Sequence, residues 1–595
     1  MSRLGDWLDE RTGHRKLLAE ALDEPLPGGA RWAYVWGSAL TLSFLVQAVT
    51  GWLLMTVYQP SATTAWSSVW YIQHRVSWGW VVRGLHHFGA QAMVVLLFAH
   101  LGQTAIFGAY KKPREMNWLF GLVLMGLTLA FALTGYLLPW DQKGYWATRV
   151  ATNIAGSIPV VGHAMQRLLV GGSEYGHLTL SRFYSLHVFM LPAAIVVVFA
   201  LHLALFRKHG VTPPEDADAT KVEPFYPKQL GKDLLVGLAV LGILFALTLR
   251  EHGAPLDAPA DPASNYPARP EWYFLALFEL LKFVPGRIEW VAAVGLPFVL
   301  GGYLVLLPFL DRGASRAVRA RVRWLAPIGA VLVGAAALTW RSRANDAADP
   351  AFLAARATAE KSAAQASELA TKGVPPSGPL AMLAADPATQ GPLLFQKHCA
   401  GCHRLGELGP PADKATATDL SGWGTRAWVA ALLDKPDALH MFGATAFKGM
   451  MPSFKHAPAD PTEAAGFKPL SEADESAVTD FLEAQARGDD AKGTAGEKQI
   501  KQRCTTCHRL DGEEPLDPES LAPELRGWAS VAWTRHQLVN PGAGKTYTAA
   551  SMDEKLEGHM PAFGKELEPS DLDLMAHWLT ETARKLPVAV TSAKP

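Results

Sequence analysis

Seven long apolar runs occupy the first 340 residues of this 595-residue chain and restrict it to a membrane-spanning fold. About 20 apolar residues suffice for a helix to cross the hydrocarbon core, where only helices and closed barrels satisfy their backbone hydrogen bonds. The rest of the chain has the composition of a water-soluble protein. The sequence therefore predicts an all-α fold with spans at Tyr34–Tyr58, Gly84–Ala109, Asn117–Trp140, Tyr184–Phe206, Leu234–Leu249, Trp290–Leu310 and Trp324–Trp340.

Basic residues mark one side of the predicted membrane. They follow the second span at Lys111–Arg114 and the fourth at Arg207–Lys208, and they fill the loop Arg312–Arg323. The positive-inside rule makes this side, which includes the amino terminus, cytoplasmic. Because the number of spans is odd, we expect the soluble part to lie in the periplasm, outside a bacterial inner membrane. The net charge of zero gives no reason to expect a nucleic acid as partner.

Two of the apolar runs carry pairs of histidines. His86 and His100 are 14 residues apart, which places them within about 40° on one helix face and about 21 Å apart along the axis. His187 and His202 are 15 residues apart, about 60° on the same scale, whereas His87 points to another side. One intramembrane histidine could simply bond to a neighbouring helix, although such residues are usually functional. Two pairs at matching spacing predict two stacked bis-histidine sites for non-covalent haem b in a four-helix bundle.

All four cysteines lie in two C-x-x-C-H motifs, CAGCH and CTTCH. This motif attaches a c-type haem through two thioethers and supplies a histidine to the iron. Disulfides are also possible in the periplasm, but they would leave both trailing histidines unexplained. The predicted haem c sites pair Cys399 with Cys402 and Cys504 with Cys507, with His403 and His508 as axial ligands.

The two motifs belong to an internal repeat. DLSGWGTRAWVAALLDKP aligns with ELRGWASVAWTRHQLVNP, and the repeats continue with GMMPSF and GHMPAF. These Met-Pro turns resemble the sixth-ligand loop of class I cytochromes c, which implies Met451 and Met560 as iron ligands. Methionines that only pack a core are the alternative, and Met450 and His559 are adjacent competitors. Met451 and Met560 are favoured because they align between the repeats.

The membrane half resembles cytochrome b of the cytochrome bc (bc1/b6f) complexes over about residues 30–340. The segment PEWYFLALFELLKFVPG carries the family's PEWY motif, and the resemblance implies that Glu271 takes a proton from quinol at an outer site. A simple ion pair with Arg269 is the alternative for this carboxylate. The loop PWDQKGYWATRVATNI resembles the helix that lines the same site, which makes Tyr145 and Tyr273 plausible contacts of the quinol.

Further residues support the resemblance. Glycines that are 14 apart in spans one and three can let a haem edge approach the backbone at both levels, although glycine is common in membrane helices. Arginines in the loops are candidates for ion pairs with haem propionates. The alternative is that they only reflect the positive-inside rule. The candidates are Gly37, Gly51, Gly121 and Gly135 beside the haems, Arg83 and Arg114 for propionates, and Arg207, His209, Lys232 and Asp233 at an inner quinone site, where Arg207 is equally explained by the positive-inside rule.

Three details favour the b6f branch: the 15-residue histidine spacing in span four, the DQ-x-GYW loop and the stop at seven spans. The chain also departs from that branch. Val35 stands where the b6 cysteine tethers an extra haem, and the two membrane parts, often separate chains, are fused. The dihaem tail stands in for the c-type subunit of the complex.

The resemblance implies a proton-translocating quinol:cytochrome c oxidoreductase. Quinol would give one electron to a Rieske iron–sulfur protein and the other to the haems b, and the haems c would serve a periplasmic cytochrome c or a terminal oxidase. The Rieske protein must be a separate partner, because the chain has no spare Cys/His set for its cluster. The quinone pool, membrane lipid and a second copy of the chain in a homodimer complete the expected partners. The alternative is a non-enzymatic haem conduit, against which PEWY argues.

We expect six segments along the chain. They are an amphipathic surface helix at 1–30, a dihaem bundle at 31–215, a quinol-site membrane domain at 216–344, a partly helical linker at 345–390, and small α-helical cytochrome c domains at 391–488 and 489–595.

Overall fold

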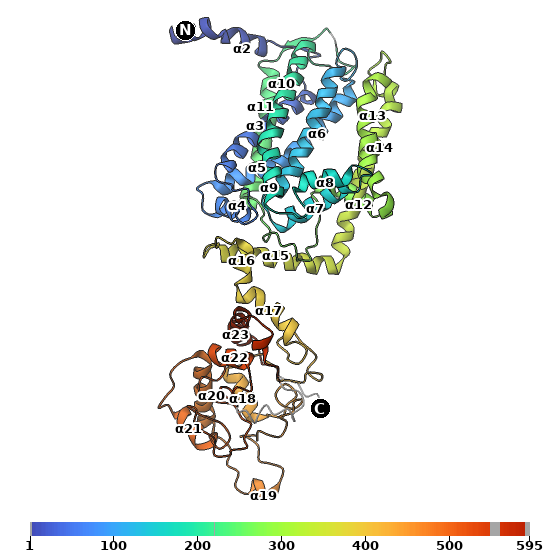
Figure 1. Cartoon of the computed structure of the whole chain (residues 1–595). Coiled ribbons are helices and arrows are strands. Elements are labelled where there is room, and N and C mark those ends of the chain that lie inside the picture. Colours follow the sequence, from blue (N-terminus) through green and yellow to red (C-terminus); the bar gives the residue numbers. More distant parts are fainter. Residues whose placement is uncertain (1–2, 219, 548–559, 589–595) are drawn as a thin grey trace. The chain divides into compact units, whose positions relative to one another are not determined.

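The computed structural model describes residues 3–218, 220–547 and 560–588 (Figure 1). The chain divides into two compact units, Met1–Met382 and Leu383–Pro595. Helix is the main regular structure of both units and strand is almost absent from the described residues, which confirms the predicted all-α class. Strands β1 (Pro25–Pro27) and β2 (Val222–Pro224) form one short antiparallel ribbon, which ties the amino-terminal segment to the chain just before the fifth span.

Among the described residues, seven helices are long and apolar enough to cross a membrane, as predicted. Their ends differ from the predicted ends: the first three helices stop two or three residues earlier, whereas the fourth, fifth and seventh extend beyond the apolar run. The spans comprise η1 (Trp32–Tyr34) with α3 (Val35–Met55), α5 (Gly79–Phe107), α6 (Glu115–Leu137), α9 (His177–Ser185) with η2 (Leu186–Met190) and α10 (Leu191–His209), α11 (Lys228–Arg250), η5 (Val291–Gly295) with α13 (Leu296–Leu310), and η6 (Val318–Arg321) with α14 (Val322–Ala348).

The first four spans form the centre of unit 1. Helix α3 packs along α5, α10 packs along α6, and α11 covers α3 and α5 from one side (Figure 1). The remaining helices of unit 1 lie before, between and after these spans along the chain. They are α1 (Arg3–Thr12), α2 (His14–Leu22), α4 (Ala65–His74), α7 (Gln142–Gly156), α8 (Gly162–Val170), η3 (Trp272–Phe274), α12 (Leu275–Leu281), η4 (Gly286–Ile288), α15 (Pro350–Ala370) and α16 (Pro379–Ala384).

The fourth span contains a π-helical turn, η2, and His187 lies inside it. A π turn holds more residues than an α turn, so it absorbs about one residue of spacing. The 15 residues from His187 to His202 therefore rotate like about 14 α-helical residues, and the pair lies about 40° apart rather than 60°. The spacing then matches that of His86 and His100.

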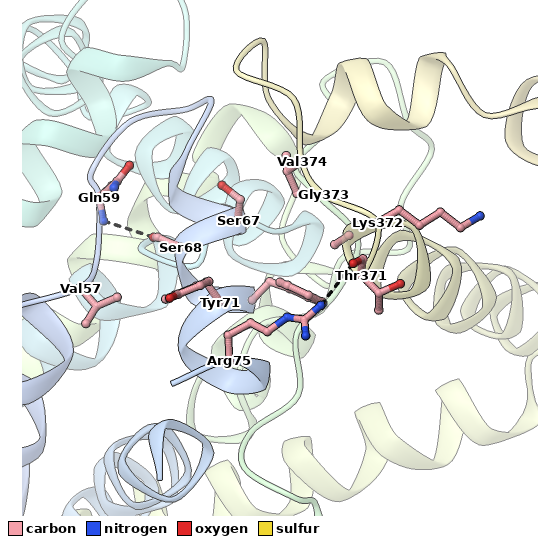
Figure 2. Close-up of a pocket in the computed structure, with 12 residues that line it drawn as sticks. Val57, Gln59, Ser67, Ser68, Tyr71, Arg75, Thr371, Lys372, Gly373 and Val374 are labelled. Atoms are coloured by element: carbon pink, nitrogen blue, oxygen red, sulfur yellow. Dashed lines mark hydrogen bonds between the residues drawn. The ribbon is translucent and has the colours of Figure 1, made fainter. Parts of the chain in front are cut away.

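The predicted linker is folded onto unit 1. Helix α14 continues past Trp340 to Ala348, and α15 packs on α4, where Trp70 Nε1 donates to Ser367 Oγ at 3.0 Å. An open pocket of about 580 Å³ lies between these helices, and Arg75 reaches across it to the carbonyl of Thr371 (Figure 2). None of the predicted site residues lines this pocket.

Unit 2 has one core to which both repeats contribute. Trp423 and Trp428 of the first repeat pack against Trp528 of the second, with ring centroids 5.9 and 5.6 Å away. The predicted boundary near residue 488 separates two sequence repeats, but the packing of the helices does not follow it. The helices are α17 (Pro387–His398), α18 (Arg426–Asp434), α19 (Pro461–Ala464), α20 (Glu472–Arg487), α21 (Ala495–Arg503), α22 (Val531–Val539), η8 (Phe563–Lys565) and α23 (Pro569–Ala583).

Candidate functional site

The structure brings His86 and His187 together between α5 and η2. Their ring centroids are 6.3 Å apart at an interplanar angle of 75°. Thr50 Oγ and Thr134 Oγ lie 2.9 and 3.1 Å from the Nδ1 atoms of His86 and His187, so each ring is oriented by one hydroxyl. Sequence reasoning missed these threonines, although each stands directly before a predicted glycine, in the dipeptides Thr50-Gly51 and Thr134-Gly135. Such hydrogen bonds fix the ring orientation that a metal ligand needs.

His100 and His202 form the second level. His202 Nδ1 lies 3.0 Å from the carbonyl oxygen of Asn117, which orients its ring. His100 Nδ1 is buried and has no hydrogen-bond partner among the described residues. The two levels lie at opposite ends of the bundle, because His86 and His100 are 14 residues apart on one helix.

The four predicted glycines lie against the four histidines. A Cβ added to each glycine would meet the Cε1 atom of one ring, at 3.1 Å for Gly51 and His86, 2.5 Å for Gly135 and His187, 3.6 Å for Gly37 and His100, and 3.4 Å for Gly121 and His202. Each level therefore has two imidazole side chains as ligands and two glycines, which leave the backbone free of side chains beside the rings. This donor set and this space fit a bis-histidine haem at each level.

Glu271 lies in a polar site at the end of the bundle that holds His86. Its Oε1 accepts a 2.8 Å bond from Lys143 Nζ, and its Oε2 accepts a 3.3 Å bond from Gln91 Nε2. Trp272 Nε1 donates to Gln91 Oε1 at 2.7 Å, so Gln91 joins two residues of PEWY to α5. Burial by itself would raise the pKa of Glu271, but the charge and hydrogen bond of Lys143, with a smaller effect of His87, hold it below the usual value.

Arg269, the alternative partner of Glu271, pairs with another carboxylate. Arg269 forms an ion pair with Asp346 on α14 at 2.8 Å and lies between the rings of Phe278 and Phe352. Sequence reasoning missed Lys143, the variable position of the DQ-x-GYW loop, because that residue lies 128 positions from Glu271. No local pattern in the sequence joins the two.

Lys143 lies in the first turn of α7, and two features fix the backbone of this turn. Asp141 caps the helix, its Oδ1 accepting a 2.8 Å bond from the backbone N–H of Gly144. A Cβ at Gly144 would lie 2.4 Å from the carbonyl of Tyr136, so glycine is required for this approach. Burial, followed by the charge of Asp257, raises the pKa of Asp141 to about 6.

The two predicted tyrosines occupy different environments. Tyr273 follows Trp272 in η3, and burial, followed by the charge of Glu271, raises its pKa. Tyr145 is 3% exposed and packs edge-on against Trp140 and Trp146, and burial raises its pKa as well. Tyr273 therefore shares the field of Glu271, whereas Tyr145 belongs to the aromatic cluster beneath α7.

The two predicted propionate arginines have protein partners. Arg83 Nη1 donates to Gln73 Oε1 at 2.7 Å and to the carbonyl of Ala254, and Nη2 donates to the carbonyl of Pro255 at 2.6 Å. Arg114 Nη2 donates to the carbonyl of His209 at 2.5 Å, while its Nε is buried without a partner among the described residues. Of the two, Arg114 keeps a free buried donor for a further acceptor.

The predicted inner quinone residues Arg207, Lys232 and Asp233 each contact a different partner. Asp233 accepts a 2.7 Å bond from Ser38 Oγ, next to Gly37 at the His100 level. Lys232 Nζ lies 4.4 Å above the ring of Trp32. Arg207 forms an ion pair with Glu24 at 3.0 Å. Only Asp233 is tied to the second histidine level, so an inner quinone site stays a prediction.

The two C-x-x-C-H histidines are held alike. His403 Nδ1 and His508 Nδ1 each lie 2.9 Å from a carbonyl oxygen, that of Thr418 and that of Pro523. This contact leaves the other ring nitrogen of each histidine for iron. The four cysteines form no disulfide, so their thiols are available for two thioether pairs. The donor set fits two covalent haems c.

The candidate sixth ligands differ in burial. Met451 and Met560 are partly buried against the core of unit 2, and Gln537 Nε2 lies 3.7 Å from Met560 Sδ. Met450 is 49% exposed, which favours Met451. The other competitor, His559, lies outside the described residues.

Three family models match consecutive parts of the chain. They are Cytochrome b(N-terminal)/b6/petB over residues 91–259, Cytochrome b(C-terminal)/b6/petD over residues 259–359, and Cytochrome c over residues 388–486 and 493–583. The order of the matches is the order of the membrane part and the repeats described above.

Individual proteins give the same result. Cytochrome b6 of Synechococcus elongatus and that of Mastigocladus laminosus are each 39% identical over 214 residues, 36% of this chain and 100% of theirs. A cytochrome bc complex cytochrome b subunit of Chlorobaculum thiosulfatiphilum is 39% identical over 294 residues, 48% of this chain and 67% of that protein. A solved structure described as a hyperthermophilic respiratory Complex III has a TM-score of 0.51 and 27% identity, and the match covers 57% of this chain and 91% of that one. The chain therefore belongs to the cytochrome b/b6 family and carries two cytochrome c domains in the same polypeptide.

Proposed function

We propose that the chain is the cytochrome b subunit of a proton-translocating quinol–cytochrome c oxidoreductase in a bacterial inner membrane, and that quinol is oxidised beside Glu271. The observation that carries this proposal is the polar site of Glu271, Lys143 and Gln91 at the end of an otherwise apolar bundle. Gln91 lies on α5, the helix that carries His86. The names of two similar proteins, a bc complex subunit and a Complex III, support the proposal.

The chemistry needs a base at the membrane edge. Quinol loses two electrons and two protons when it becomes quinone, and an ionised carboxylate accepts one of these protons by general-base catalysis. Lys143 keeps Glu271 ionised before quinol arrives, because the pair favours the charged form of the carboxylate. When Glu271 takes the proton, the ion pair loses its negative partner, and the side chain is free to leave Lys143.

Haem b at the histidine pairs and haem c at the two motifs would supply one-electron carriers. We propose that a separate Rieske protein is the partner for the other electron, and that a periplasmic cytochrome c or a terminal oxidase accepts electrons from the repeats. The residues of this chain hold these groups and manage the proton; they do not themselves change redox state.

The test is Glu271→Gln, which keeps the size of the side chain but cannot take a proton. Quinol-dependent cytochrome c reduction should fall by about 10²–10⁴-fold, while the spectra of all haems stay unchanged. The matched control is Glu279→Gln, eight residues on, where the carboxylate pairs with Lys282 and Arg341 and not with the site. That variant should keep quinol oxidation. If Glu271→Gln kept the full rate, a non-enzymatic haem conduit would explain the chain better.

A further inference from the structure

Each cytochrome c repeat begins with a helix that ends directly before its C-x-x-C-H motif, and each of these helices packs on the other repeat. Helix α17 ends at His398 and packs along α23, the last helix of the second repeat. Helix α21 ends at Arg503 and packs along α20, the last helix of the first repeat. Among these four helices, which are fully described, neither α17 with α20 nor α21 with α23 forms a comparable pair. The repeats therefore exchange their first and last helices.

Glycines at equivalent positions make the two helix crossings possible. Gly391 and Gly496 each stand eight residues before the first cysteine of their motif. A Cβ at Gly391 would lie 2.0 Å from Cγ of Trp578 on α23, and one at Gly496 would lie 2.5 Å from Cβ of Phe481 on α20. Only glycine allows backbones and rings to approach this closely. Both crossings join residues of different repeats.

The loops after the motifs follow the same exchange. Gly422 and Gly527 each stand 19 residues after the motif histidine. The backbone N–H of Gly422 donates to the carbonyl of Ala583, at the end of α23, at 2.8 Å. The backbone N–H of Gly527 donates to Gln485 Oε1, near the end of α20, at 2.9 Å. Each of these loops is therefore bonded to the last helix of the other repeat.

The exchange of helices between the repeats brings the segment of Met560 towards the first motif. Met560 stands nine residues before α23 begins, and Phe563 follows it by three residues. The ring of Phe563 packs edge-on against that of His398, with centroids 6.1 Å apart. His398 directly precedes Cys399. Phe563, three residues after Met560, thus lies beside the residue that precedes the first haem-attachment motif.

The same geometry places Met451 near the second motif. Arg503, which directly precedes Cys504, donates from Nη1 to the carbonyl of Lys468 at 2.8 Å. Two residues on, the N–H of Leu470 donates to the carbonyl of Phe454 at 3.0 Å. Phe454 follows Met451 by three residues, as Phe563 follows Met560. The two halves of unit 2 are therefore built alike.

We propose that each haem c is held by both repeats: the iron bound by His403 takes Met560 as its second axial ligand, and the iron bound by His508 takes Met451. Each half of unit 2 then contains the attachment motif of one repeat and the methionine loop and closing helix of the other. Neither repeat holds a six-coordinate haem by itself, so each site needs both repeats.

The first experiment reads the ligand directly in the full-length chain. Cys399→Ala with Cys402→Ala removes the attachment of one haem and leaves a single haem c on the second motif. In that background, Met451→Ala should abolish the far-red methionine–iron charge-transfer band of the oxidised protein, and Met560→Ala should keep it. The opposite result, or retention of the band in both variants, would overturn the proposal.

A second experiment does not depend on removing a haem. A protease site is placed in the exposed turn after α20, at Gly488–Asp490, in the haem-loaded chain in its membrane. After cleavage, the carboxyl-terminal fragment with its haem stain should stay with the membrane until denaturant is added. Adding Gly391→Val, which meets Trp578 on α23, should release the cut fragment several-fold faster. Prompt release from the cut chain without that substitution would show that the repeats fold separately.

Discussion

Replacing Gly135 with alanine should remove one haem b and leave the other. The new Cβ would lie 2.5 Å from His187 Cε1, whereas carbon atoms in contact are ordinarily about 3.5–4.0 Å apart. The ring must therefore move by about 1 Å, but Thr134 Oγ holds its Nδ1 at 3.1 Å and the ring of Phe131 packs edge-on against it. Overpacking of this kind costs about 1–3 kcal/mol. At about 1.4 kcal/mol per factor of ten, the affinity for haem should fall by about 5- to 150-fold.

The control is Gly121→Ala at the other level, where the added Cβ would lie 3.4 Å from His202 Cε1 and needs only a small adjustment. The assay is pyridine haemochrome analysis of the purified chain, with the covalent haem c as the internal standard. Two sites of each kind give a b-to-c ratio of about one. The ratio should fall towards about one half in Gly135→Ala and stay near one in Gly121→Ala. Equal ratios in the two variants, or a larger loss in Gly121→Ala, would refute the reasoning from these distances.

Three further predictions follow from the site and the topology. Lys143→Met removes the charge that lowers the pKa of Glu271, so quinol oxidation, which needs the ionised carboxylate, should fail at a higher pH on acidification than in the unaltered chain; an unchanged pH–rate profile would contradict this role of the lysine. Asp346→Asn weakens the ion pair that holds Arg269, two residues before Glu271. The KM for quinol, measured by steady-state kinetics, should rise by up to about fivefold with the haem spectra intact. An unaltered KM would argue against a positioning role of this ion pair. Protease added to spheroplasts should release haem-stained fragments of the cytochrome c repeats, whereas cleavage in inverted vesicles alone would reverse the assigned orientation.

The features that could be predicted from the sequence are those that local composition decides. A run of apolar residues forms a membrane helix whatever its neighbours are, and all seven predicted spans coincide with helices. The histidine pairs were also readable, because two residues on one helix keep a fixed angular relation. The pair of Lys143 and Glu271 was not readable, since it forms only when the loop after the third span meets the segment after the fifth.

The exchange of helices between the cytochrome c repeats shows a different limit. Both repeats carry a glycine at the same distance before the motif and an aromatic residue in the closing helix, Trp578 or Phe481. Each glycine could therefore accept either ring, and the sequence pattern is satisfied by both pairings. The path of the loops that contain Gly422 and Gly527 distinguishes them, and loop paths depend on the whole fold. The repeat thus indicated the fold of each half but not which segments compose it.

The π turn at His187 changes what the number of residues between His187 and His202 means for their orientation. In a regular helix, one residue inserted between the two histidines would rotate the second ring by about 100°. Because the turn absorbs the extra residue next to the first ring, the insertion is confined to a few hydrogen bonds of the backbone. A residue can therefore be added at this point of the membrane helix without turning His187 and His202 to different faces.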